Sequence, residues 1–244
     1  MEMHLAQKAI AATETKLKCS HGCDVTKCTV CTALIPSSFW ERLSWKRFGQ
    51  KENTFHVTSL SSCLAKSYFD ADSCPEESVE SAWAKLRGTL LHYAGRSLGW
   101  NELKAKLTFE LGGTAITIVG YVDAYDPETG TIYDLKTTRF VEWQEKKGFI
   151  PRLSHIEQIQ CYYTLLDSYG IPVNRLVLLY TDDKNIVPKE VPLGNRREWM
   201  VSRATILHRA LTKSELPAPE PSDACKYCPH VARCPAMSTV QSLC

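Results

Sequence analysis

The sequence predicts a single α/β core in which a mixed sheet is flanked by helices. Three observations support this fold class: a long amphipathic segment at residues 76–103, strand-like segments after it, and a helical segment at 154–169 that leads into the apolar run RLVLLYT. Helices that alternate with strands in a chain of 244 residues are typical of one mixed α/β domain.

The predicted helix over residues 76–103 has apolar side chains at three- and four-residue steps, as an amphipathic helix does. These side chains are Val79, Trp83, Leu86, Leu90 and Ala94. We therefore expect one face of this helix to pack against the core, with His92 near its middle.

The next segment predicts three antiparallel strands. KLTFEL leads into Gly112 and Gly113, which are a hairpin signal, and TAITIVGYVDAY is separated from TIYDLKT by the turn-rich DPETG. With a four-residue loop at 127–130, Asp126 pairs with Thr131. Counting back through that register places Asp123 directly opposite Asp134.

The C-terminal half predicts a helix, a strand and a second helix. Ser154 and Glu157 have capping-box spacing, so we expect Ser154 to be the N-cap of a helix that ends near Tyr169, before Gly170. RLVLLYT at 175–181 is typical of a strand buried on both faces. A helix over 196–213 and a stiff linker with prolines at 217, 219 and 221 follow.

Composition limits the classes of partner. Hydrophobic residues make up 44% and charged residues 23%, no apolar run reaches about 20 residues, and the N-terminus does not resemble a secretory signal. We expect a cytoplasmic protein with no membrane partner. The net charge of +2 means that DNA contacts would need a local basic groove. Arg139, Lys146, Lys147 and Arg152 are candidates, although such a cluster is equally typical of a solvated surface.

Asp123 and Asp134 are candidate metal ligands. In the predicted register their Cβ atoms lie roughly 4.5–5.5 Å apart. Two carboxylates this close repel each other unless a cation lies between them, and Mg²⁺ or Mn²⁺ prefers such oxygen ligands. Lys136 lies on the same strand face as Asp134, where an ammonium group can stabilise charge that develops on a phosphate.

Two further segments supply candidate side chains. His92 lies where a helix next to the hairpin can deliver an imidazole to the same metal, although a lone histidine is often structural. Gln158 and Tyr162 are four residues apart and so share a helix face. Glutamine can donate to a phosphate and tyrosine can stack on a base, but the pair alone is also typical of an ordinary amphipathic helix.

The ordered segments RGTLLH, GYVD, DLKT and QIQCY resemble the motif series of RecB-like nucleases in the PD-(D/E)xK superfamily, over about residues 54–234. The resemblance implies a restriction-endonuclease-like core. It also implies that the metal is bound by His92, Asp123 and Asp134, with the Leu135 carbonyl as a further candidate ligand. By the same resemblance, Lys136 assists the attacking water, and Gln158 and Tyr162 support DNA binding.

The eleven cysteines are many for a reducing compartment, and their clusters suggest metal binding. Cys225, Cys228 and Cys234 lie within ten residues and need a fourth ligand, for which Cys63 is the best candidate. Zinc is the alternative to an iron–sulphur cluster here. A second cluster consists of Cys19, Cys23, Cys28 and Cys31. It suits a zinc knuckle, but also unliganded thiols or disulfides.

The segment TSLSSC and the three C-terminal cysteines resemble stand-alone CRISPR-associated iron–sulphur exonucleases. The resemblance implies a [4Fe–4S] rather than a [2Fe–2S] cluster, 5′-to-3′ cutting of single-stranded or end-frayed DNA, and a role beside the Cas integrase in antiviral spacer acquisition. The chain then divides into a helical, cysteine-rich extension (1–50), a RecB-like nuclease core (51–216) and a cluster segment (217–244). The alternatives are a repair, recombination or mobile-element nuclease, and a non-catalytic module that binds DNA ends.

Overall fold

A computed structural model describes residues 17–18, 22–24, 27–28, 53–72, 77–97 and 102–236. Most of the predicted helical, cysteine-rich extension (1–50) lies outside them. Within it, Leu17–Lys18 form strand β1, which pairs in parallel with β3 (Glu77–Ser78). Cys19 and Cys31 also lie outside the described residues.

One sheet has three strands in the order β2-β5-β4. β4 (Leu103–Leu111) and β5 (Thr114–Val122) form the predicted antiparallel hairpin, and Gly112 and Gly113 adopt φ angles of 56° and 82° at its turn. Two successive positive φ angles are what a two-residue hairpin turn requires. β2 (Thr54–His56) pairs in parallel with β5, and alternate side chains of the hairpin face the core.

The second sheet has four strands in the order β6-β7-β8-β9. These are β6 (Ala124–Asp126), β7 (Thr131–Thr137), β8 (Arg175–Thr181) and β9 (Ile186–Val191). β7 and β8 are parallel, and the other pairs are antiparallel. The pairing of Asp126 with Thr131 is confirmed, and β8 spans the predicted residues with Leu176 and Leu178 fully buried.

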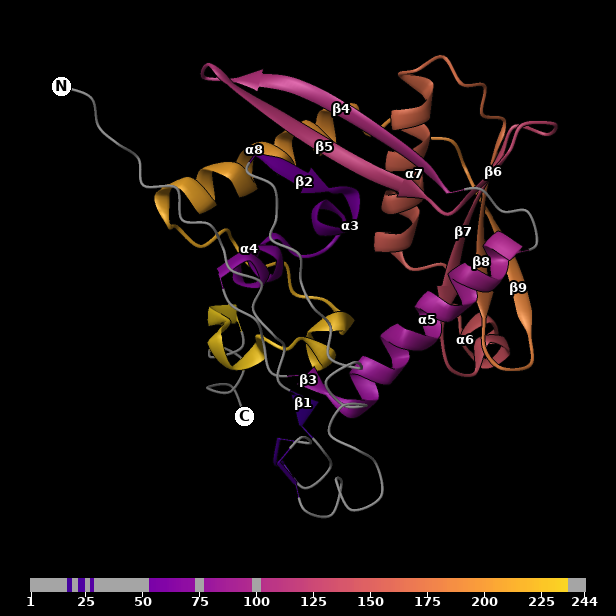
Figure 1. Ribbon diagram of the computed structural model, residues 1–244, viewed down its shortest axis with the longest axis horizontal. Helices are drawn as coiled ribbons and strands as arrows, with labels where there is room; N and C mark the ends of the chain where they lie inside the picture. Colours follow the sequence, from indigo (N-terminus) through magenta and orange to yellow (C-terminus); the bar gives the residue numbers. More distant parts are fainter. Residues whose placement is uncertain are drawn as a thin grey trace.

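The predicted set of three antiparallel strands is wrong in one respect. TAITIVGYVDAY does not form one strand: β5 ends at Val122, β6 begins at Ala124, and the two belong to different sheets. At the break, the Asp123 carboxylate accepts the backbone N–H of Leu135 at 2.9 Å. A side-chain acceptor takes the place of a ladder bond here, and the sheets diverge on either side of it (Figure 1).

The helix that joins the two sheets is α7 (Leu153–Asp167), which packs against strands of both (Figure 1). Gly120 of β5 permits this contact, because a Cβ atom there would lie 2.6 Å from Leu165 Cδ1. α3 (Val57–Leu60), α4 (Leu64–Asp72) and α8 (Arg197–Lys213) pack together beside β2. The 3₁₀ helices η1 (Asp223–Tyr227) and η2 (Val231–Arg233) follow α8.

Two helix predictions need correction. α5 runs over Val79–Ser97 and is shorter than the predicted 76–103, of which Leu103 belongs to β4. Its predicted inner face is largely exposed: Trp83 is 53% and Leu90 55% exposed. α7 begins one residue before Ser154, with Arg152 as N-cap and no side-chain cap. The N–H of Arg152 donates to the Tyr180 hydroxyl at 3.1 Å, so a contact with β8 anchors the start of the helix.

α8 begins within one residue of its predicted start. The short α6 (Val141–Lys146) lies between β7 and α7. No described helix has the length and apolar character needed to cross a membrane.

Candidate active site

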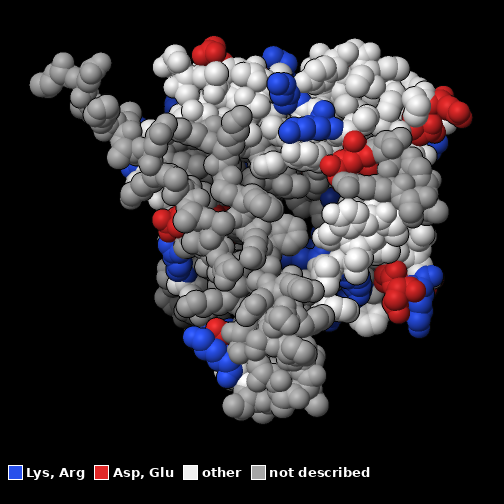
Figure 2. Space-filling view, viewed as in Figure 1, with Lys and Arg blue, Asp and Glu red and all other residues white. Residues whose placement is uncertain are grey.

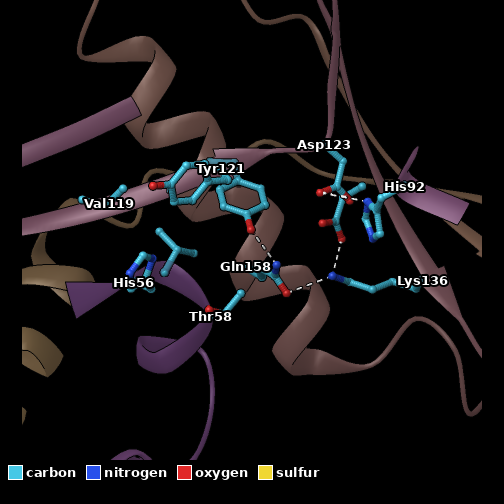
Figure 3. Close-up of a pocket in the computed structure, with 12 residues that line it drawn as sticks. His56, Thr58, His92, Val119, Tyr121, Asp123, Lys136 and Gln158 are labelled. Carbon is cyan, nitrogen blue, oxygen red and sulfur yellow. Dashed lines mark hydrogen bonds and ion pairs between the residues drawn. The ribbon is translucent and has the colours of Figure 1, made fainter. Parts of the chain in front are cut away.

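A cavity of about 330 Å³ lies where the two sheets, α5 and α7 meet. The face of the molecule in Figure 2 is hollowed below β4 and β5, and Figure 3 shows the side chains around the cavity. Its lining residues are His56, Val57, Thr58, His92, Val119, Gly120, Tyr121, Asp123, Asp134, Lys136, Gln158 and Tyr162. The six side chains that the sequence motifs single out therefore line one cavity.

The Asp134 carboxylate is buried and lacks hydrogen-bond donors among the described residues. Its exposed fraction is 0%, and neither oxygen accepts a hydrogen bond from any described residue. Lys136 Nζ lies 2.7 Å from Asp134 Oδ2, which makes an ion pair without hydrogen-bond geometry. Buried carboxylates without hydrogen-bond donors are costly, and coordination of a cation is the usual compensation.

Asp123 lies one residue before β6, next to the strand pair that places Ala124 opposite Tyr133. Burial, and after it repulsion from Asp134, raise the pKa of Asp123 to about 8, although Lys136 and the Leu135 N–H oppose the increase. The two carboxylates thus resist simultaneous ionisation. A divalent cation between them would remove this repulsion.

Lys136 is held by two partners. Besides its contact with Asp134, it donates to Gln158 Oε1 at 2.9 Å, and Gln158 Nε2 donates to the Tyr162 hydroxyl at 2.7 Å (Figure 3). The shared helix face of Gln158 and Tyr162 is confirmed. The chain of contacts fixes the ammonium group beside the two carboxylates.

The suggestion that Tyr162 stacks on a base is not supported by its burial. The side chain is only 3% exposed and packs where a Cβ atom on Gly120 would meet it at 3.0 Å. Burial and the nearby carboxylates raise the pKa of Tyr162 well above its usual range. Its ring is part of the core, because α7 approaches β5 closely at Gly120.

His92 comes from α5, and its Nδ1 atom lies 3.5 Å from Asp123 Oδ1. Within the described residues, no group of three or more His, Cys, Asp or Glu side chains converges closely enough to hold a metal ion. The donor set nevertheless fits a hard divalent ion: one orphaned carboxylate, a second carboxylate with a raised pKa and an adjacent imidazole. Leu135 lies between them in β7, and the role of its carbonyl as a ligand stays a prediction.

The predicted basic cluster lies around α6. Arg139 precedes the helix, Lys146 and Lys147 end it, and Arg152 precedes α7; all four are exposed. Arg152 contacts Gln144 Oε1 at 3.5 Å. None of these four residues lines the cavity, and the part of this cluster in DNA binding stays a prediction.

All seven described cysteines are thiols. Burial raises the pKa of Cys228, and Cys225 and Cys63 each add to the increase. Among the described residues these cysteines do not form a group that could hold a metal ion, so the ligand set with Cys63 stays a prediction. Cys234 follows η2. Of the N-terminal group, Cys23 is exposed and Cys28 buried.

Tyr121 and His56 also line the cavity with aromatic side chains and were not among the candidate site residues of the sequence. Tyr121 stands within GYVD, two residues before Asp123, so its position next to an acidic motif was the available signal. His56 lies 67 residues before Asp123 in the chain and reaches the cavity through the parallel pairing of β2 with β5. A three-residue strand gives too short a pattern to predict that pairing.

The chain matches one family model and resembles solved structures. The family model described as "PD-(D/E)XK nuclease superfamily" matches residues 47–235. The solved structure of SSO0001 matches with a TM-score of 0.58 at 22% identity, over 86% of this chain and 98% of that chain, and shares its fold. No curated protein sequence matches.

Two exonuclease structures are more distant. An alkaline exonuclease (LHK-Exo) from Laribacter hongkongensis has a TM-score of 0.42 at 12% identity, over 67% of this chain and 90% of that chain. A phage-related exonuclease from Haemophilus somnus 129PT has a TM-score of 0.39 at 14% identity, over 66% of this chain and 96% of that chain. Likeness at this level has no bearing on substrate.

Proposed function

Because this chain belongs to the PD-(D/E)XK nuclease superfamily, we propose that it is a metal-dependent exonuclease that hydrolyses the phosphodiester bonds of single-stranded DNA. The observation that carries the proposal is the buried Asp134 carboxylate, which accepts no hydrogen bond from a described residue and faces Asp123. Carboxylates arranged in this way suit a divalent cation, and superfamily nucleases use Mg²⁺ or Mn²⁺.

The residues of the cavity would have different roles in phosphodiester hydrolysis. Asp123 and Asp134 would hold the ion, with His92 as a further ligand, and a bound divalent ion polarises a phosphoryl oxygen. Lys136, fixed by Asp134 and Gln158, presents an ammonium group that can orient the attacking water and stabilise charge on the phosphate. Because Lys136 cannot easily leave this position, its donors are already aligned before the substrate arrives.

The second part of the proposal is an iron–sulphur cluster held by Cys63, Cys225, Cys228 and Cys234. It is supported by the electrostatic influence of Cys63 and Cys225 on Cys228, which brings the thiol before α4 into the surroundings of the C-terminal cysteines. Such a cluster would tie the segment before α4 to the C-terminal tail. If the cluster is present, it and the TSLSSC segment favour a role in CRISPR spacer acquisition. A nuclease of repair, recombination or a mobile element is the alternative to this role.

Asp134→Ala tests the metal site. Wild-type protein should degrade a labelled single strand with Mn²⁺ and not with EDTA. The variant should lose cutting but keep DNA binding, because a metal ligand is removed and the DNA surface is left intact. Residual cutting above a trace by Asp134→Ala would contradict the assignment, and wild-type protein that binds DNA without cutting it would favour a non-catalytic module.

Anaerobic purification tests the cluster. Cys63→Ser should lose iron and visible absorption, whereas Cys161→Ser should keep both, since Cys161 is fully buried in the core on α7. Iron retained in Cys63→Ser and lost in Cys23→Ser or Cys28→Ser would show that the ligand set is wrong. A colourless protein that contains zinc would replace the cluster with a zinc site.

A further inference from the structure

One face of the β2-β5-β4 sheet carries an aromatic pair that borders the cavity. The rings of Tyr121 and His56 stack with centroids 5.9 Å apart and planes inclined by 17°. Both residues line the cavity that contains Asp123 and Lys136. Figure 3 shows His56 and Tyr121 on one side of this cavity, with Asp123 and Lys136 on the other. A nucleotide that reaches the carboxylates would therefore meet this aromatic pair.

Two lysines extend the same face. In β4, Lys104 is paired with Tyr121 and Lys106 with Val119, and both lysines are exposed because the alternate residues Ala105 and Leu107 point into the core. Lys104 Nζ lies 5.4 Å from the centroid of the Tyr121 ring. Figure 2 shows Lys and Arg side chains along β4 above the hollow. Positive charge thus lines the approach to the aromatic pair.

We propose that this face, which consists of His56, Tyr121, Lys104 and Lys106, binds the nucleotides of a single DNA strand next to the scissile phosphate. An unpaired base stacks on the aromatic pair, and the two lysines contact the adjacent phosphates. This inference rests on the proposed function, because it names the part of the DNA that the same cavity receives. Stacked aromatics beside a basic groove are the usual means of binding single strands, whereas duplex DNA keeps its base faces covered.

The exposure of each ring agrees with this assignment. Tyr121 is 37% exposed, whereas Tyr162, which packs against Gly120, is 3% exposed, so only the former offers a ring to a base. Burial and nearby Lys104 lower the pKa of His56, which leaves its imidazole uncharged at neutral pH. The positive charge of this face therefore resides in the two lysines.

Fluorescence anisotropy with labelled oligothymidylate in EDTA tests the aromatic pair without cleavage. Tyr121→Ala should weaken binding roughly 5- to 150-fold. Tyr121→Phe should bind as the wild type does, because it keeps the ring. Trp143→Ala is the matched control: it removes an aromatic side chain that is 53% exposed on α6, away from the cavity lining, and should leave affinity unchanged.

An oligonucleotide series identifies the stacked base. Replacing single thymidines by abasic sites should weaken wild-type binding at one position near the end of the strand, and Tyr121→Ala should be insensitive there. Blunt duplex should bind Tyr121→Ala and wild type alike. Equal affinity of Tyr121→Ala and wild type for the single strand, or a loss in Trp143→Ala alone, would overturn the assignment.

Salt titration tests the lysines independently. If each lysine contacts one phosphate, the slope of log affinity against log salt should become shallower by about 0.7 for Lys104→Ala and for Lys106→Ala. Lys184→Ala, in the exposed β8–β9 loop, should leave the slope unchanged. Unchanged slopes in both β4 variants would refute the phosphate contacts.

Failure of this inference differs from failure of the proposed function. If wild-type protein cuts DNA with Mn²⁺ but Tyr121→Ala binds the single strand normally, only the proposed stacking on the aromatic pair is wrong. If Tyr121→Ala loses binding but wild-type protein does not cut DNA with any divalent ion, the stacking proposal stands and the nuclease proposal fails.

Discussion

The affinity of the cavity for Mn²⁺ should depend on pH through Asp123. Because burial and repulsion from Asp134 raise the pKa of Asp123 to about 8, the metal-free protein holds a proton on this carboxyl at lower pH, and the ion must displace it. About half of the carboxyl is ionised at pH 8 and about 1% at pH 6, so affinity should rise about 50-fold between these values, or about 2.3 kcal/mol.

Isothermal titration calorimetry measures this effect. Titrations of Mn²⁺ at pH 6 in two buffers with different ionisation enthalpies should show about one proton released per ion bound. Asp123→Asn should bind Mn²⁺ more weakly and without that proton release. His92→Ala should keep it, which separates proton release by Asp123 from release by the neighbouring imidazole.

The reasoning would be refuted by two results. One is an Mn²⁺ affinity that changes by less than about five-fold between pH 6 and pH 8. The other is proton release of equal size in Asp123→Asn, which would assign the proton to another group.

Since the folded-state pKa of Asp123 is raised, its contribution to stability is lost as pH rises through that pKa; in EDTA, Asp123→Asn should therefore raise Tm by at least about 3 °C at pH 8, with a smaller gain at pH 5, by differential scanning fluorimetry. Lys136→Ala should cut DNA about 100-fold or more slowly while binding Mn²⁺ normally, and loss of Mn²⁺ binding would show that its role is structural. Arg203→Ala removes donors to two backbone carbonyls near α3 and an ion pair with Glu220, and should lower the free energy of unfolding in urea by about 1–3 kcal/mol. Lys213→Ala, at the exposed end of the same helix, should change it by less than about 0.5 kcal/mol.

Local patterns were reliable where one physical period governs them. Gly112 and Gly113 predicted a hairpin turn because few other residues adopt two positive φ angles in succession, and the structure has that turn. Asp134 and Lys136 were expected on one strand face because side chains alternate along a strand, and their ion pair agrees.

The helix starts and faces were less predictable, because tertiary contacts override local preference. Ser154 has the spacing of a cap, yet the bond from the Arg152 N–H to Tyr180 sets the start of α7. The apolar periodicity of residues 76–103 correctly predicted a helix, α5. Periodicity does not say what covers a helix face, and Trp83 and Leu90 of the predicted inner face are exposed. Tyr162 was offered as a stacking residue, and only the packing of α7 on Gly120 shows that it is buried.

The sequence by itself determined the α/β class, the hairpin register that pairs Asp126 with Thr131, and the candidate residues of the cavity. These depend on periods of two and 3.6 residues and on turn chemistry, which act over short stretches of chain. Only the tertiary structure decided that the chain divides into two sheets at Asp123, that His56 and Tyr121 stack beside the carboxylates, and that Asp134 lies buried without a hydrogen bond. Burial and long-range pairing arise when distant segments pack together, so no local window of sequence contains them.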